Sequence, residues 1–161
     1  MTRKNTGFTL VEILIVVIIL GILAAIVIPQ FTEASNDARV SAMISDLQTV
    51  RSQVELYKVQ HLDNPPGTVS GTWTIGNFVP HLTGITSAQG VTVARGTEGA
   101  LGPYLQKFPT NPFGSGTAAE SALVADATGA IDPNTASGNL GWWFNSTTGN
   151  FGVNTTVYLD R

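Results

Sequence analysis

The sequence contains no cysteine, so no disulfide can staple a small domain and no thiol can act as a nucleophile. Histidine is nearly as scarce, because His61 and His81 are the only two in the chain. The serines have no histidine and acid at a recognisable spacing, so the sequence holds no catalytic constellation. These absences predict that the protein is not an enzyme, and that each histidine lies in a solvated loop or at a helix end.

Charge is also sparse, since charged residues make up 12% of the 161 residues and 8 basic residues stand against 11 acidic ones. Sequence-specific binding of nucleic acid depends on a concentrated positive surface. A mildly acidic chain without a basic cluster argues against such a partner. The length leaves room for one modest core beyond a long helix, which predicts a single small domain.

The chain is rich, by contrast, in apolar residues near its start. Residues 8–28 number 21, and a helix of that length, at about 1.5 Å rise per residue, nearly matches the hydrocarbon thickness of a bilayer. The basic residues Arg3 and Lys4 favour a cytoplasmic start, with the rest of the chain facing outward. A secretory signal peptide is the competing interpretation, but its apolar core spans only about 7–15 residues and ends at small residues rather than at Pro29.

One acid, Glu12, interrupts the apolar run. An ionised carboxylate in the middle of a membrane helix costs about 2.5–3.5 kcal/mol, and less near an end of the helix. Glu12 therefore either has a partner or a functional reason to be there, or it lies shallow enough to reach water.

The residues around Glu12 form a highly specific motif. Gly7-Phe8-Thr9-Leu10-Val11-Glu12, after a short basic leader and before the apolar run, resembles the class III signal sequence of type IV pilins and type II secretion pseudopilins. The resemblance implies a type IV pilin-like α+β fold, in which a long N-terminal helix, transmembrane in one half and amphipathic in the other, packs on a small antiparallel β-sheet. It also implies that prepilin peptidase cleaves after Gly7, that Phe8 becomes the methylated N-terminus, and that Glu12 draws the subunit into a filament.

Cleavage would give Glu12 a natural partner. The new ammonium group on Phe8 needs a counter-charge when it is buried, just as the carboxylate does. If Phe8 of one subunit meets Glu12 of the next, the pair forms at one axial offset only and sets the register of the filament. This pairing is a hypothesis about assembly.

The predicted function is that of a structural subunit that polymerises into a helical, pilus-like filament, specifically a type II secretion pseudopilin acting in protein export. The implied partners are further copies of the chain, prepilin peptidase, an inner-membrane assembly platform with a cytoplasmic ATPase, minor pseudopilins and a secretin. The subunit would span the inner membrane once, with its head in the periplasm, and then join a periplasmic or surface filament.

Two alternative functions stay open. One is a type IV pilin for adhesion, motility or DNA uptake, and the other is a membrane-anchored binding module that never polymerises. The missing cysteines favour the pseudopilin, because many type IV pilins close a C-terminal loop with a disulfide.

The predicted division of the chain is a leader at 1–7, a transmembrane and assembly helix at 8–29, an amphipathic helix at 30–62, and a head at 63–161 that shares its core with 40–57. Pro29 cannot donate a hydrogen bond to the carbonyl four residues earlier, and Gly21 loosens the preceding turn. A kink or local melt is therefore expected between Gly21 and Pro29, which in filaments of this family lets packed helices extend.

The second half of the long helix carries an apolar stripe at steps of three and four residues, made of Val40, Met43, Leu47, Val50, Val54 and Tyr57. We expect this stripe to pack on the head's own sheet, with the helix ending between Gln60 and Leu62.

The head has the composition of short strands and loops. A short helix is expected to begin or end within 78–83. A turn-rich loop is expected at 99–112, which resembles a loop of pseudopilin-like proteins. Residues 140–145 and 150–154 predict an antiparallel hairpin, and 121–125 predict a further strand. Within the hairpin, Trp142 and Trp143 should point to opposite faces, one in the core and the other exposed or at a subunit contact.

The resemblance also raises the question of calcium, because major pseudopilins commonly hold this ion in a C-terminal loop. Calcium takes about six to eight oxygen ligands, several of them carboxylates. The acids beyond the helix are dispersed, and Asp126 with Asp132 makes the best candidate loop. We expect no cofactor, with calcium at these two residues as a candidate only.

Overall fold

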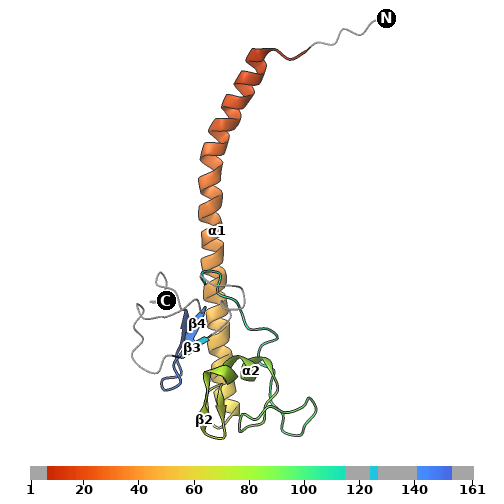
Figure 1. Cartoon of the computed structure of the whole chain (residues 1–161), viewed down its shortest axis with the longest axis vertical. Helices are drawn as coiled ribbons and strands as arrows, with labels where there is room; N and C mark the ends of the chain where they lie inside the picture. Colours follow the sequence, from red (N-terminus) through yellow and green to blue (C-terminus); the bar gives the residue numbers. More distant parts are fainter. Residues whose placement is uncertain (1–6, 115–123, 127–140, 154–161) are drawn as a thin grey trace, which may run out of the picture. The chain divides into compact units, whose positions relative to one another are not determined.

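The computed structural model describes residues 7–114, 124–126 and 141–153, and divides the chain into two compact units, 1–40 and 41–161 (Figure 1). The helices are α1 (Leu10–Gln60), the short 3-10 helix η1 (Ile75–Asn77) and α2 (Phe78–Thr83). The strands are β1 (Thr68–Val69), β2 (Thr72–Trp73), β3 (Val124–Asp126), β4 (Trp142–Phe144) and β5 (Phe151–Val153). A long N-terminal helix with small sheets confirms the predicted α+β class, and α2 confirms the predicted short helix.

The first unit contains the N-terminal part of α1, which continues through Pro29. The carbonyl of Pro29 accepts a hydrogen bond from the Thr32 hydroxyl at 2.7 Å, while its nitrogen has no proton to donate. Among the described residues, α1 is the one helix that is long and apolar enough to cross a membrane. In the single chain the helix therefore continues through Pro29 without a break. Melting between Gly21 and Pro29 in a filament stays a prediction.

The second unit folds around the C-terminal part of α1, whose stripe is buried as predicted from Met43 to Tyr57. Val40 is only half-buried and belongs to the first unit. The core that the stripe joins is Met43, Leu47, Val50, Val54, Tyr57, Phe78, Leu82, Phe108, Trp142, Phe144, Phe151 and Val153. Because each large apolar side chain contributes about 1.5–3 kcal/mol on burial, this cluster is the main source of stability for the unit.

α1 ends at Gln60, within the predicted interval. The Asp63 amide donates to the Lys58 carbonyl at 2.9 Å, and Leu62 and Asp63 have positive φ values of 57° and 66°. This left-handed pair turns the chain out of the helix, and the prolines at 65–66 prevent its continuation.

The predicted C-terminal hairpin is confirmed, since β4 and β5 are antiparallel with Trp142 opposite Val153. Gly149 in the connecting turn has a φ of 75°, which glycine adopts without strain. β3 joins β4 in parallel, so this sheet is mixed where only antiparallel pairs were expected. Parallel neighbours need a connection of about a dozen residues or more, and the sequence between β3 and β4 is long enough to provide it.

The two adjacent tryptophans of β4 do point to opposite faces, but the second is not simply exposed. Trp142 is buried, and its indole N–H donates to the Pro109 carbonyl at 3.0 Å. Trp143 is half-buried and lies across Gly152, where an added Cβ would come within 2.1 Å of the indole. Because Gly152 has no side chain, the indole folds down onto the strand and donates to the Val153 carbonyl at 3.1 Å.

The two histidines lie at helix ends, as expected, since His61 directly follows α1 and His81 is in the last turn of α2, but the expectation that they are solvated is wrong. His61 and His81 are 0% and 2% exposed, in the interior of the second unit. Each makes hydrogen bonds to neighbouring polar groups there, which offset the cost of removing an imidazole from water.

Candidate functional site

The start of α1 is closed by a reciprocal pair of hydrogen bonds between Thr9 and Glu12. Thr9 precedes the first helical residue and is the N-cap. Its backbone N–H and its hydroxyl both donate to Glu12 Oε2, each at 2.8 Å. The Glu12 amide in turn lies 3.3 Å from the Thr9 hydroxyl oxygen. This is a capping box, and it satisfies backbone donors that the first turn of a helix would otherwise leave without partners.

The sequence contained the signal for this arrangement. A Thr followed three residues later by a Glu, directly before an apolar run, is the usual signature of a capping box. The prediction from the motif gave Glu12 a role in assembly and gave Thr9 none. The structure brings these two together and therefore adds Thr9 to the site.

The capping box also defines what the Glu12 carboxylate can do. The positive end of the helix dipole and two hydrogen bonds stabilise its charge at the start of α1. Both of these hydrogen bonds go to Oε2, so Oε1 keeps its capacity to accept from a cation supplied by another molecule. The site is therefore suited to electrostatic pairing.

Gly7 and Phe8 precede α1 in an exposed, non-helical segment, and Phe8 is 85% exposed. The bond between them is therefore accessible to another protein. A Cβ added to Gly7 would meet nothing within 4 Å, and the same holds for Gly21 inside α1. Packing within the described chain requires glycine at neither position.

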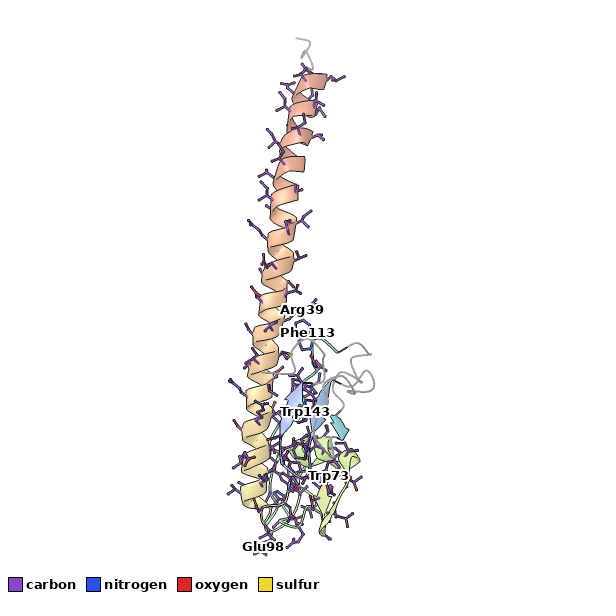
Figure 2. All side chains as sticks on the ribbon, turned by 90° about the vertical axis from the view of Figure 1, so that its left-hand side faces the viewer. Arg39, Trp73, Glu98, Phe113 and Trp143 are labelled. Carbon is purple, nitrogen blue, oxygen red and sulfur yellow. The ribbon has the colours of Figure 1, made fainter. Side chains whose placement is uncertain are left out.

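Beyond Glu12, the first half of α1 presents apolar side chains on every face. Those from Leu10 to Ile28 are 38–81% exposed, and Figure 2 shows them projecting from the helix on all sides. A helix that is apolar all round needs lipid or other protein around it. Gly21 lies within this apolar stretch, and Pro29 directly follows its last residue, Ile28.

The calcium candidates receive no support. Asp132 lies outside the described residues, and only the backbone of Asp126 is described, in β3. Within the described ranges, no group of three or more histidine or acidic side chains could hold a metal ion.

The N-terminal part of this chain resembles a known family. A family model described as the prokaryotic N-terminal methylation motif matches residues 2–28. The chain is 33% identical over 113 residues to the type II secretion system core protein G of Pseudomonas aeruginosa, a match that covers 70% of this chain and 71% of that protein.

Two further relatives extend the comparison. The core protein G of Dickeya chrysanthemi is 37% identical over 117 residues, covering 71% of this chain and 67% of its own. The type IV narrow pilus major component of Thermus thermophilus is 33% identical over 104 residues, covering 58% of this chain and 90% of its own. No solved structure matches the chain at a significant level.

Proposed function

Because this chain belongs to the family of type II secretion pseudopilins and type IV pilins, whose members are structural subunits and not enzymes, we propose that it polymerises into a filament as a core pseudopilin in protein export. The observation that carries the proposal is the exposed apolar half of α1 with Glu12 in its first turn. In the membrane, lipid covers this surface. In a filament, the same half of α1 from neighbouring subunits replaces the lipid.

The processing sites follow from the motif and from the exposure of residues 7–8. Cleavage after Gly7 would leave Phe8 as the methylated N-terminus, one residue before the N-cap of α1. The new ammonium group of one subunit then pairs with Glu12 of its neighbour through the oxygen that the capping box leaves available. This pair fixes the axial register and contributes little to net stability, because both charges must leave water.

The organisation of the subunit follows from the same assignment. The leader is 1–7, the transmembrane and assembly helix is 8–29, the amphipathic helix is 30–62, and the head is 63–161. The segment from Gly21 to Pro29 melts or kinks in the filament, and this local change lets the packed helices extend. Support comes from Pro29, whose missing N–H leaves that turn of α1 one hydrogen bond short.

Within the family, the pseudopilin role is favoured over the pilin role. Relatives named as core protein G align over more of this chain than the pilus component does, 70–71% against 58%. The absence of cysteine also fits a subunit that closes no C-terminal loop with a disulfide. A type IV pilin is the second candidate, since the match covers 90% of the pilus component.

Location and partners follow from the role. The apolar helix and the methylation motif are consistent with anchoring in the inner membrane before assembly. From there the subunit would pass from prepilin peptidase to an assembly platform driven by a cytoplasmic ATPase, and would join minor pseudopilins beneath a secretin. Filaments confined to the periplasm would support the pseudopilin, whereas fibres outside the cell would identify a pilin.

The test separates the charge of Glu12 from its role as a cap. Glu12→Gln keeps an oxygen that accepts from Thr9 but removes the charge, whereas Glu12→Ala removes both. Both variants should insert into the membrane and lose filament assembly by more than tenfold. Glu33→Gln, which neutralises an exposed acid elsewhere on α1, is the matched control and should assemble normally.

Assembly can be read by cross-linking, because a chain without natural cysteines gives no background. Pairs of cysteines introduced between residues 13 and 28 should yield a ladder of oligomers. If Glu12→Gln forms a normal ladder, the charge pair is not the register device. If no pair cross-links in membranes that contain the assembly platform, the chain is a non-polymerising membrane-anchored module.

A further inference from the structure

Both histidines of the chain lie in one buried cluster in the second unit. The ring of His61 stacks on Tyr57 at 3.6 Å between centroids, and its Nε2 lies 2.8 Å from the Thr86 hydroxyl. Nδ1 of His81 lies 2.8 Å from the Tyr57 hydroxyl. Tyr104 makes edge contacts with the rings of Tyr57 and His61. These five residues are named the histidine cluster, and no part of the proposed assembly function uses them.

The hydrogen bonds fix the protonation state of His81. The backbone amide of Gly67 lies 3.1 Å from His81 Nδ1 and can only donate. Nδ1 therefore carries no proton, and the imidazole is neutral with its proton on Nε2. Burial raises the pKa of Tyr57 to about 12, so this hydroxyl keeps its proton and also donates to Nδ1.

His61 has the opposite arrangement. Its Nδ1 lies 2.9 Å from the backbone carbonyl of Tyr57, which can only accept, so this nitrogen carries a proton. Its Nε2 faces the Thr86 hydroxyl, which can donate or accept. A second proton on His61 would keep both hydrogen bonds. A second proton on His81 would place an N–H against the N–H of Gly67.

Gly67 is the point at which the β1–β2 hairpin closes. Its φ of 102° is in the region that favours glycine, and its carbonyl accepts from the Thr74 amide at 3.0 Å. The Trp73 indole donates to the Pro66 carbonyl at 3.1 Å, and a Cβ on Gly67 would come within 2.8 Å of that indole nitrogen. His81, from α2, thus holds the base of the hairpin. The rest of the hairpin is attached separately, because the Ser70 amide donates to the Gln89 carbonyl at 3.2 Å and the Trp73 ring lies 6.2 Å from that of Phe144.

We propose that His81 is a proton-sensitive latch on the β1–β2 hairpin. At neutral pH its Nδ1 accepts from the buried Gly67 amide. As the pH falls below about 6.5, the ordinary titration range of histidine, opening of the latch with uptake of a proton on Nδ1 becomes progressively more favourable. The proton leaves the Gly67 amide without an acceptor and releases the base of the hairpin around Gly67 from α2. Tyr57 is the titratable member of the apolar core around the α1 stripe, and its raised pKa keeps it neutral in this pH range, so the core stays folded.

The surroundings of His81 oppose its charged form. Burial lowers the pKa of His81, and the nearby His61 lowers it further. Burial lowers the pKa of His61 as well, partly offset by the hydrogen bond to the Tyr57 carbonyl. The titratable groups around the latch are His61 and Tyr57 from the end of α1 and Tyr104 from the loop that follows Gly99. No carboxylate among the described residues contributes to the shift on His81.

These directions determine how the latch depends on pH. The unfolded chain takes up a proton on His81 near pH 6.5, whereas the folded chain takes it up only at lower pH. The stabilisation is therefore complete above about pH 6.5 and decreases as the pH falls below that value. For one such proton, the opening equilibrium changes by at most about tenfold per pH unit.

The test uses the full chain in detergent micelles and follows the protection of the Gly67 amide against hydrogen exchange from pH 7.5 to 5.5. His81→Asn places a non-titrating oxygen close to the position of Nδ1, so it can accept from Gly67 at any pH. His61→Asn is the matched control. The protection factor should fall by up to tenfold per pH unit in the wild type and in His61→Asn, and should stay constant in His81→Asn. A decline retained in His81→Asn, or a constant value in the wild type, overturns the latch.

A second measurement covers the case in which His81→Asn does not fold. The chain has two imidazoles, so nitrogen NMR of histidine-labelled wild type gives two sets of signals that His61→Asn assigns. His81 should show the Nε2–H tautomer at pH 7.5 and titrate below pH 6.5. An Nδ1–H tautomer, or a titration at or above the ordinary value, overturns the proposal whether or not the chain forms filaments.

Discussion

The two halves of α1 are one continuous helix, but they depend on different surroundings. In the first half, Ile13 and Ile18 are 52% and 53% exposed, whereas in the second half Val50 and Tyr57 are 0% exposed. The second half alternates an apolar stripe with polar residues and is buried by its own chain. The first half is apolar on all faces, and within the described residues nothing of its own chain buries it. A helix can thus be specified in part by its own chain and in part by lipid or a neighbouring subunit.

The largest difference between the halves should appear on truncating a buried ring. Phe144 is fully buried and its ring lies 4.5 Å from that of Phe78. Phe144→Ala should lower the free energy of unfolding of the second unit by about 3–5 kcal/mol, because it leaves a cavity in a packed core. Ile18→Ala is the matched change in the first half and should leave this value unchanged.

Urea unfolding of the full chain in detergent measures both variants. Tryptophan fluorescence reports on the second unit alone, because Trp73, Trp142 and Trp143 all lie there. Equal losses in Phe144→Ala and Ile18→Ala would mean that the two halves are not energetically independent.

Glycine should respond with opposite signs in the two units. Gly152→Ala forces the indole of Trp143 off the strand and should destabilise the second unit by about 1–3 kcal/mol. Gly21→Ala meets nothing within 4 Å in an exposed helix, so it should stabilise α1 locally by about 0.5–1 kcal/mol. Urea unfolding measures the first effect, and amide exchange in α1 measures the second. Faster exchange around residue 21 after the substitution would contradict the prediction.

The most local effect is expected at the start of α1. Thr9→Ala removes the N-cap hydroxyl, and with it the hydrogen bond donated to Glu12 Oε2 and the one accepted from the Glu12 amide. This loss should cost about 0.5–2 kcal/mol, confined to the first turn. Faster amide exchange at residues 10–12 would report the fraying. Thr32→Ala removes a hydroxyl in the helix interior and serves as the comparison. If both variants leave exchange at 10–12 unchanged, the capping box does not hold the first turn.

The parts of the fold that were predictable are those fixed by local pattern. The stripe from Met43 to Tyr57 follows from helical periodicity alone, and the hairpin follows from Gly149 between two apolar runs. The end of α1 near Gln60 follows from the prolines shortly after it. In each case the deciding residues lie within a few positions of one another.

The parts that were missed depend on contacts between distant residues. The His61 ring is hydrogen-bonded to Thr86, and the His81 ring accepts from the Gly67 amide, and neither partner is near in sequence. The parallel pairing of β3 likewise depends on a long connection and not on its own residues. Thr9 is different, because its spacing of three residues from Glu12 is visible in the sequence and is sufficient to predict the cap.

The stripe on the second half of α1 also has a mechanical consequence. From Met43 to Tyr57 it extends over about 21 Å of helix, at about 1.5 Å per residue. A pull on α1 beyond Pro29 reaches the core through the backbone hydrogen bonds of the helix and is shared among all the stripe contacts at once. Because shear along the helix must break those contacts together, tension in α1 displaces the second unit as a whole before the unit unfolds.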